Sequence, residues 1–220
     1  MRIHLKLTSN TKACPFNYQR NLVGAFHKWL GDNEIHDQLS HYSMSWLSPG
    51  KNVNDKHLSF PKGATWFISS PDSNIIKQLI HSIQKDPIVA FGMEVSEVVL
   101  QKTPEFEKTT KFYLATPALI KRTLEDDISK QYGYDDKEVN DLMTETLVNK
   151  LTKAGVNAEN VRVSFDKEYF KPKRKLITFN GIGNKANWCP VVIEGSPEAI
   201  AFAWDVGVGN STGIGFGALK

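Results

Sequence analysis

The sequence predicts an α+β protein made of two tandem ferredoxin-like (RRM-like) domains, and three observations support this prediction. Its 220 residues accommodate two compact domains of about 100 residues each. The hydrophobic pattern of the first half follows the order βαββαβ, which is the ferredoxin-like arrangement. The second half repeats this order less cleanly, as a tandem duplication of the fold would.

In the first half, alternation of polar and apolar residues predicts the strands, and apolar stripes at helical spacing predict the helices. Gly31 marks the end of the first helix. Ser70, Pro71 and Asp72 supply an N-cap, a proline at the first helical position and an early acid for the second helix. The predicted elements in chain order are a strand at 2–8, a helix at 17–30, strands at 41–47 and 64–69, a helix beginning at 70–72, and a strand at 89–100.

In the second half, Ser196, Pro197 and Glu198 repeat the helix-start signal of the first half. A charged stretch near Thr103 and Pro104 interrupts the pattern, so we expect one domain at 1–108 and a second at 109–220. The predicted elements are a strand at 110–120, a helix at 135–153, strands at 161–165, 176–179 and 188–194, and a helix beginning at 196–198.

Composition excludes several classes of protein. With 40% hydrophobic and 23% charged residues, the chain is neither collagen-like nor disordered as a whole. No apolar run is long enough to span a membrane, and the first residues alternate instead of forming a signal peptide, so we expect a soluble, cytoplasmic protein. Cys14 and Cys189 lie far apart without a CxxC partner, which predicts two reduced, buried thiols and no zinc site.

Charge is unevenly distributed, although the net charge is only +3. Residues 125–145 contain eight acidic and two basic side chains, whereas residues 161–189 contain seven basic and two acidic ones. One face of the protein could therefore attract polyanions.

The C-terminal segment 207–217 holds five glycines in eleven residues. Glycines allow the backbone to approach a ligand closely and to present N–H groups to a phosphate, although a turn with kinks is the plain alternative. These glycines follow a helix and precede a strand, which is the reverse of the dinucleotide-binding context. A P-loop is excluded because Gly-Lys-Ser/Thr does not occur.

With this tail, the order of motifs along the chain resembles the CRISPR-associated endoribonucleases of the RAMP superfamily, which process precursor CRISPR RNA. The tail has the form GxG, a short polar stretch and GxGFG at the end of two ferredoxin-like units. The other landmarks, in chain order, are Pro15-Phe16-Asn17-Tyr18-Gln19, Ile35-His36-Asp37, Tyr42-Ser43-Met44-Ser45, Thr116-Pro117-Ala118 and the basic run Lys171–Lys175.

The resemblance implies metal-independent cleavage in which the 2′-hydroxyl of the RNA attacks the adjacent phosphate and leaves a 2′,3′-cyclic phosphate and a 5′-hydroxyl. Such chemistry needs proton transfer near neutral pH, which suits histidine. His36 matches the family's general acid/base position, and His27 falls where many relatives carry a catalytic residue on the first helix. Either His36 or His41 could be the partner of His27, and for each of the three a surface or core role is the alternative.

The resemblance also implies an RNA-binding surface, and it implies no metal or other cofactor. For each lysine or arginine predicted to contact RNA, an ordinary solvent-exposed position is the simpler explanation when that residue is taken alone. The implied partner is CRISPR repeat RNA, with effector-complex subunits as further candidates and no membrane. The predicted RNA-binding residues are Lys121, Arg122, Lys173, Arg174, Lys175, Gly207, Gly209, Gly213, Gly215 and Gly217.

Two alternatives remain at this stage. The first is a non-catalytic subunit that holds CRISPR RNA within an effector complex. The second is a small-molecule enzyme of ferredoxin-like fold that binds a nucleotide with its glycine-rich segment.

Overall fold

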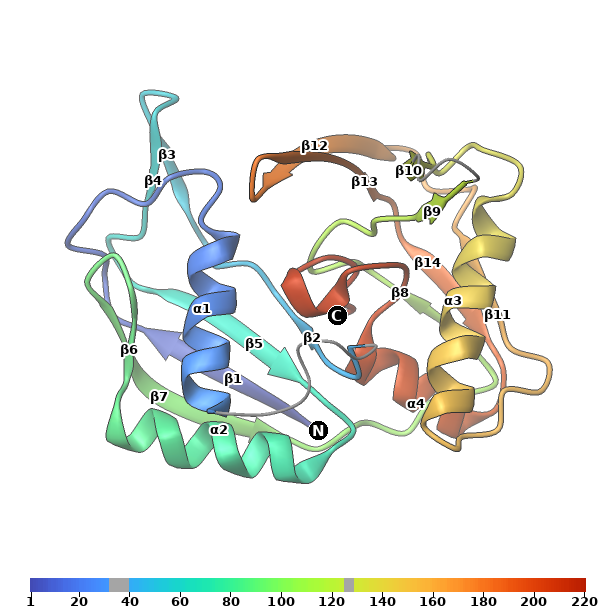
Figure 1. The fold of residues 1–220 in the computed structure, drawn as a ribbon, viewed down its shortest axis with the longest axis horizontal. Helices are drawn as coiled ribbons and strands as arrows, with labels where there is room; N and C mark the ends of the chain where they lie inside the picture. The colour runs from blue at the N-terminus through green and yellow to red at the C-terminus, as the bar shows by residue number, and fades with distance from the viewer. Residues whose placement is uncertain (32–39, 125–128) are drawn as a thin grey trace.

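The computed structural model describes residues 1–31, 40–124 and 129–220. Each half of the chain contains an antiparallel sheet and two helices, and the C-terminal segment lies between the halves (Figure 1). The predicted class, α+β with two tandem ferredoxin-like units, is confirmed. The domain boundary that we propose, between residues 108 and 109, falls immediately before the first strand of the second sheet.

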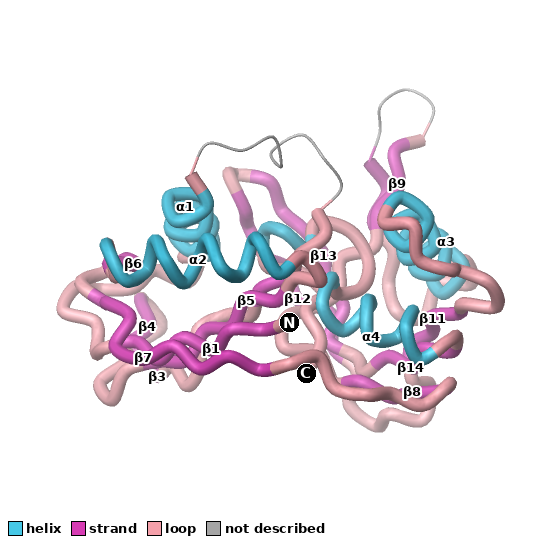
Figure 2. Tube along the Cα trace, turned by 90° about the horizontal axis from the view of Figure 1, so that it is seen from below, coloured by secondary structure: helices cyan, strands magenta, loops and turns pink. Residues whose placement is uncertain are grey.

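The first half contains a five-stranded sheet in the order β2-β5-β1-β7-β6. The first four strands of this order match a ferredoxin-like sheet, and α1 and α2 lie over one face (Figure 2). The elements are β1 (Arg2–Leu7), α1 (Gln19–Leu30), β2 (Ser43–Met44), β3 (Lys51–Val53), β4 (His57–Ser59), β5 (Ala64–Ser69), α2 (Ser73–Lys85), β6 (Ile88–Ala90) and β7 (Met93–Gln101).

The second half has a three-stranded sheet in the order β11-β14-β8. Its fourth strand is reduced to a bridge between Leu114 and Leu219 near the C-terminus. The β12–β13 hairpin is inserted between β11 and β14. The elements are β8 (Thr109–Phe112), β9 (Lys121–Thr123), β10 (Ser129–Gln131), α3 (Val139–Lys153), β11 (Arg162–Phe165), β12 (Lys173–Phe179), β13 (Ile182–Trp188), β14 (Val191–Glu194), α4 (Pro197–Val206) and the short 3₁₀ turn η3 (Thr212–Ile214).

The two similar helix-start signals act differently. In α4, the hydroxyl of Ser196 accepts a hydrogen bond from the amide of Ala199 at 3.1 Å, as predicted. In α2, the N-cap is Asp72, whose carboxylate accepts from the amide of Asn74 at 2.8 Å, so the predicted start at Ser70 is wrong. The Ser70 hydroxyl instead donates to the carbonyl of His41 at 3.1 Å.

Several predicted strands are shorter or interrupted, and the one expected at 41–47 is reduced to Ser43–Met44. Residues 89–100 form part of the β6–β7 hairpin, because Phe91 and Gly92 adopt positive φ angles and reverse the chain. The predicted strand at 110–120 ends at Phe112. Cys189 and Pro190 separate β13 from β14, where one strand was expected, since proline lacks the N–H that a strand ladder needs. The β3–β4 hairpin was not predicted.

Each half has its own apolar core, and a smaller third cluster joins them. This cluster consists of Leu119, Ile177, Ala186 and Phe216, with Trp46 packed against it. Cys14 and Cys189 are free and buried, as predicted. Among the helices of the described ranges, none is long and apolar enough to cross a membrane.

Candidate functional site

The glycine-rich segment is packed into the interior, and most of its residues are buried. The amide of Gly207 donates to the carbonyl of Ala203 at 2.8 Å, and that of Gly217 to the carbonyl of Pro117 at 2.9 Å. The amide of Gly215 donates to the carbonyl of Thr212 at 3.2 Å. These three N–H groups therefore hold the segment in place, and the expected phosphate cradle is not available from them.

Glycine is required in this segment because the backbone is crowded. Gly217 has a φ of 63°, and a Cβ atom there would overlap the carbonyl oxygen of Val208. A Cβ atom at Gly213 would press on the side chains of Ser40 and Tyr42. The glycines thus allow the C-terminal segment to pack closely against the rest of the fold.

The segment lies where elements from both halves meet. Its η3 turn packs against α1 and β2 of the first half. The Nζ atom of Lys150, on α3, donates to Oγ1 of Thr212 at 2.9 Å and to the carbonyl of Val206 at 3.3 Å. Oγ1 of Thr212 in turn donates to the carbonyl of Tyr42 at 3.1 Å. A chain of hydrogen bonds thus connects α3, through η3, to the residue that follows His41.

His41 is half-buried at this junction. Its ring meets the edge of Phe202 with centroids 5.8 Å apart, and its Nε2 atom is buried without a hydrogen-bond partner among the described residues. Burial lowers the pKa of His41 below 6.5, and the positive charges of Lys150 and Lys153 lower it further. The neutral form of His41, which is the form that can accept a proton, is therefore favoured.

His27 lies on α1, the helix that contacts η3. Its ring lies 5.1 Å from that of Phe26, which stacks on Tyr42 at 4.5 Å. His27 and the segment after His41 are thus linked through one aromatic stack. His36 lies outside the described residues, so its position relative to the other two stays a prediction.

The β12–β13 hairpin carries the predicted cations Lys173, Arg174 and Lys175, and all three are exposed. Arg174 forms an ion pair with Asp135. The Nζ atom of Lys175 lies 4.6 Å from the ring centroid of Trp188. These three residues lie within β12, whereas the sequence placed them before a strand.

Lys121 and Arg122, the other two cations predicted to bind RNA, differ from each other in how available their side chains are. Arg122 is engaged within the protein, because it pairs with Glu145 at 2.8 Å and donates to the carbonyl of Leu142 at 2.9 Å. It fastens β9 to α3, which leaves Lys121 as the more available cation of the two. For both, contact with RNA stays a prediction.

A groove of about 400 Å³ crosses the junction between the halves on the side of Trp46 and Trp188. The two rings meet edge to face with centroids 5.9 Å apart, and Nε1 of Trp46 donates to the carbonyl of Gly215 at 2.9 Å. Arg2 lies in the same groove, between the rings of Phe67 and Trp204. Arg2 itself is buried, so the exposed cation beside the two tryptophans is Lys175, whose Nζ atom lies 4.6 Å from the ring centroid of Trp188. Aromatic rings beside an exposed cation form a surface suited to nucleic acid.

Sequence reasoning missed Lys150 and the two tryptophans. Lys150 falls three residues after Leu147 and seven after Met143, both on the buried stripe of α3, so helical phase could have identified it. The pairing of Trp46 with Trp188 has no local signal, because the residues lie on different halves. Among the described residues, no group of three or more His, Cys, Asp or Glu side chains is arranged to hold a metal ion.

Comparison with known proteins identifies similar sequences and folds. The family model "CRISPR associated protein Cas6, C-terminal" matches residues 101–220. A CRISPR-associated endoribonuclease-like protein Cas6 from Pyrococcus furiosus is 24% identical over 238 residues, covering 100% of this chain and 98% of the relative. One from Pyrococcus horikoshii, Cas6nc, is 23% identical and covers 100% of this chain and 99% of its own length.

Two solved structures share the fold with a TM-score of 0.85. One, the product of a Cas6-related gene from Pyrococcus furiosus, is 22% identical, and the alignment covers 100% of this chain and 97% of that one. The other, titled "An RAMP protein binding different RNA substrates", is 20% identical, with 100% and 98% covered.

Proposed function

The chain belongs to the Cas6 family of CRISPR-associated proteins, and from this premise we propose that it is an endoribonuclease that cuts precursor CRISPR RNA within its repeats to release guide RNAs. The observation that carries the proposal is the junction at η3. There, the helix with His27, the segment that follows His41 and the C-terminal glycine-rich segment meet.

The proposed reaction needs no metal ion. The 2′-hydroxyl of the ribose attacks the adjacent phosphorus, its proton passes to an imidazole, and the 5′-oxygen of the next nucleotide leaves with a proton from a second group. The products are a 2′,3′-cyclic phosphate and a 5′-hydroxyl. The lowered pKa of His41 supports the role of proton acceptor. His27 and His36 are the proposed partners for proton donation.

The exposed cations of the β12–β13 hairpin would attract the RNA backbone. The glycine-rich segment supports binding by holding Trp46 through the carbonyl of Gly215. Gly207, Gly209, Gly213, Gly215 and Gly217 would then act mainly by allowing this packing.

The alternative is a protein of the same fold that binds CRISPR RNA, within an effector complex, without cutting it. The burial of Nε2 of His41 favours this alternative, because a buried nitrogen must be uncovered before it can meet a substrate.

One experiment separates the two functions. The purified protein is incubated with CRISPR repeat RNA from the same genome in the presence of EDTA, and the ends of the products are analysed. Cleavage with a cyclic phosphate, abolished by a 2′-deoxy substitution just upstream of the cut, supports the nuclease. Tight binding of uncut RNA supports the alternative.

A further inference from the structure

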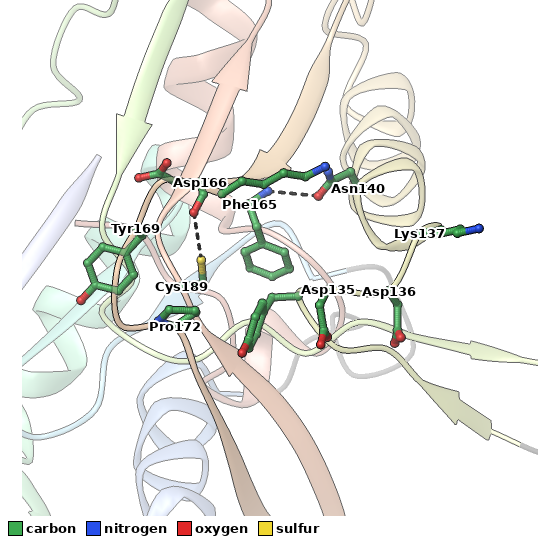
Figure 3. Close-up of a pocket in the computed structure, with 11 residues that line it drawn as sticks. Asp135, Asp136, Lys137, Asn140, Phe165, Asp166, Tyr169, Pro172 and Cys189 are labelled. Carbon is green, nitrogen blue, oxygen red and sulfur yellow. Dashed lines mark hydrogen bonds between the residues drawn. The ribbon is translucent and has the colours of Figure 1, made fainter.

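A separate cavity of about 370 Å³ lies in the second half, at the base of the β12–β13 hairpin (Figure 3). The start of α3, the end of β11 with the loop that follows it, and Cys189 surround it. The rings of Tyr134, Phe165 and Tyr169 line it. Its volume is in the range of small-molecule pockets.

The three carboxylates at this cavity already have partners. Asp135 pairs with Arg174, and Oδ2 of Asp136 accepts from the amide of Gly133 at 2.6 Å. Oδ2 of Asp166 lies 2.5 Å from Nζ of Lys111. Two of these charges are offset by Arg174 and Lys111, and no three His, Cys, Asp or Glu side chains of the described residues are arranged to hold a metal ion. The aromatic lining then favours a flat ring as the ligand.

The cavity also offers a hydrogen-bond donor. Oδ1 of Asn140 accepts from the amide of Phe165 at 3.1 Å, which fixes the plane of the side-chain amide (Figure 3). The Nδ2 group of Asn140 is then left to donate to a ligand. A heterocyclic ring with a carbonyl or ring nitrogen acceptor fits this arrangement.

The rim of the cavity has the character of a nucleic-acid surface. Phe170 is 78% exposed, and its ring lies 5.6 Å from that of Tyr169. The Nζ atom of Lys171 lies 4.9 Å from the centroid of Phe170, and Lys137 and Lys167 line the cavity itself. Exposed rings beside cations bind single-stranded RNA by stacking and charge.

We propose that this cavity binds one unpaired nucleobase of the RNA, turned out of the strand, while Phe170 stacks on a neighbouring base. The inference rests on the proposed binding of CRISPR RNA, and it places a recognition subsite away from the η3 junction. The ion pair between Arg174 and Asp135 places β12 at the edge of the cavity, and the exposed Lys171 and Lys173, on either side of Pro172, guide the RNA backbone to its mouth.

The test uses repeat RNAs in which each nucleotide in turn is made abasic. Their dissociation constants are measured for the wild type and for the Tyr169→Ser and Phe170→Ser variants. We expect one abasic position to weaken binding by the wild type about tenfold. That position should have almost no further effect in Tyr169→Ser. Phe170→Ser should lose the effect of an adjacent position.

Ile88→Ser is the matched control, because Ile88 is 54% exposed on β6, at the far edge of the other sheet. Ile88→Ser should respond to each abasic RNA as the wild type does. Tyr169→Phe, which keeps the ring, should also show the wild-type response that Tyr169→Ser loses. A Tyr169→Ser variant that binds RNA with the wild-type abasic profile would overturn the subsite alone. If the wild type bound no repeat RNA, the proposed function would fail together with the subsite.

Discussion

The Nζ atom of Lys150 lies 2.9 Å from Oγ1 of Thr212, so a buried amine on α3 is hydrogen-bonded to the C-terminal segment, and the same Oγ1 donates to the carbonyl of Tyr42 in the first half. Both of its hydrogen-bond acceptors are neutral oxygens, those of Thr212 and Val206. Burial without a carboxylate partner lowers the pKa of Lys150 from 10.5 to about 7. The link between the halves is therefore sensitive to pH.

We expect the stability of the protein to rise with pH because of Lys150. The unfolded chain keeps the Lys150 proton up to a pKa of 10.5, whereas the native protein releases it near pH 7. The unfolded state thus binds more protons between these values, and the free energy of unfolding increases by about 2 to 3 kcal/mol between pH 6 and pH 9.

Chemical denaturation of the wild type and Lys150→Met across this range measures the effect. The difference in unfolding free energy between the two should change with pH, because methionine does not titrate. Lys85→Met, on the exposed face of α2, should give a curve parallel to that of the wild type. Parallel curves for Lys150→Met would show that Lys150 keeps an ordinary pKa.

The lowered pKa of His41 predicts the acidic side of the pH–rate profile. His41 can accept a proton only while neutral, so the acidic limb of the single-turnover rate should be centred below pH 6.5, the ordinary value for histidine. Lys153→Met removes a positive charge that lowers this pKa, so the acidic limb should move to higher pH. A limb centred above pH 6.5 in the wild type, or unmoved in Lys153→Met, would remove His41 from the proton-accepting role.

Replacing His27 or His36 with alanine should slow cleavage without weakening RNA binding. General acid–base catalysis contributes roughly 100-fold or more to the rate. The single-turnover rate of each variant should fall by about this factor, while its dissociation constant stays within about twofold of the wild type. His81→Ala, on the exposed face of α2, is the control. Wild-type rates in both His27→Ala and His36→Ala would show that the site is assigned wrongly.

Two glycine substitutions should act in opposite directions. Gly217→Ala forces a Cβ atom onto the carbonyl of Val208 at a φ of 63°, so we expect a loss of at least about 2 kcal/mol of stability. Gly24→Ala, at an exposed position within α1 with open space around it, should gain about 0.5 to 1 kcal/mol. Thermal unfolding of the two variants compares them directly. If Gly217→Ala were as stable as Gly24→Ala, the backbone around Gly217 would be able to move away from the added Cβ atom at little cost in free energy.

Local patterns predicted the fold well because both halves bury regular apolar stripes. The N-cap of α4 and the end of α1 at Gly31 follow from residue types alone. The start of α2 did not, since Ser70 and Asp72 are both good N-caps. The choice depends on the hydrogen bond from Ser70 to the carbonyl of His41, which only the tertiary structure provides.

The candidate site was less predictable because its groups come from distant segments. The glycine spacing suggested a phosphate cradle, but the N–H groups of Gly207, Gly215 and Gly217 donate to backbone carbonyls instead. In the same way, Arg122 looked like a free cation, yet it pairs with Glu145 on α3. Sequence shows which groups are present, whereas long-range packing determines which of them are already engaged.

Reversing the charge of the hairpin should weaken RNA binding and reduce its dependence on salt. Lys173, Arg174 and Lys175 are all exposed on β12, so their replacement by glutamate leaves the core intact. If each cation neutralises one phosphate of a single strand, the slope of log affinity against log salt concentration should fall by about 2. Glutamate at Lys62, Lys77 and Lys85, which are exposed on the first half, changes the net charge equally and controls for long-range attraction. The hairpin would be excluded from the RNA-binding surface if both triple variants lost affinity to the same extent, because net charge alone would then explain the loss.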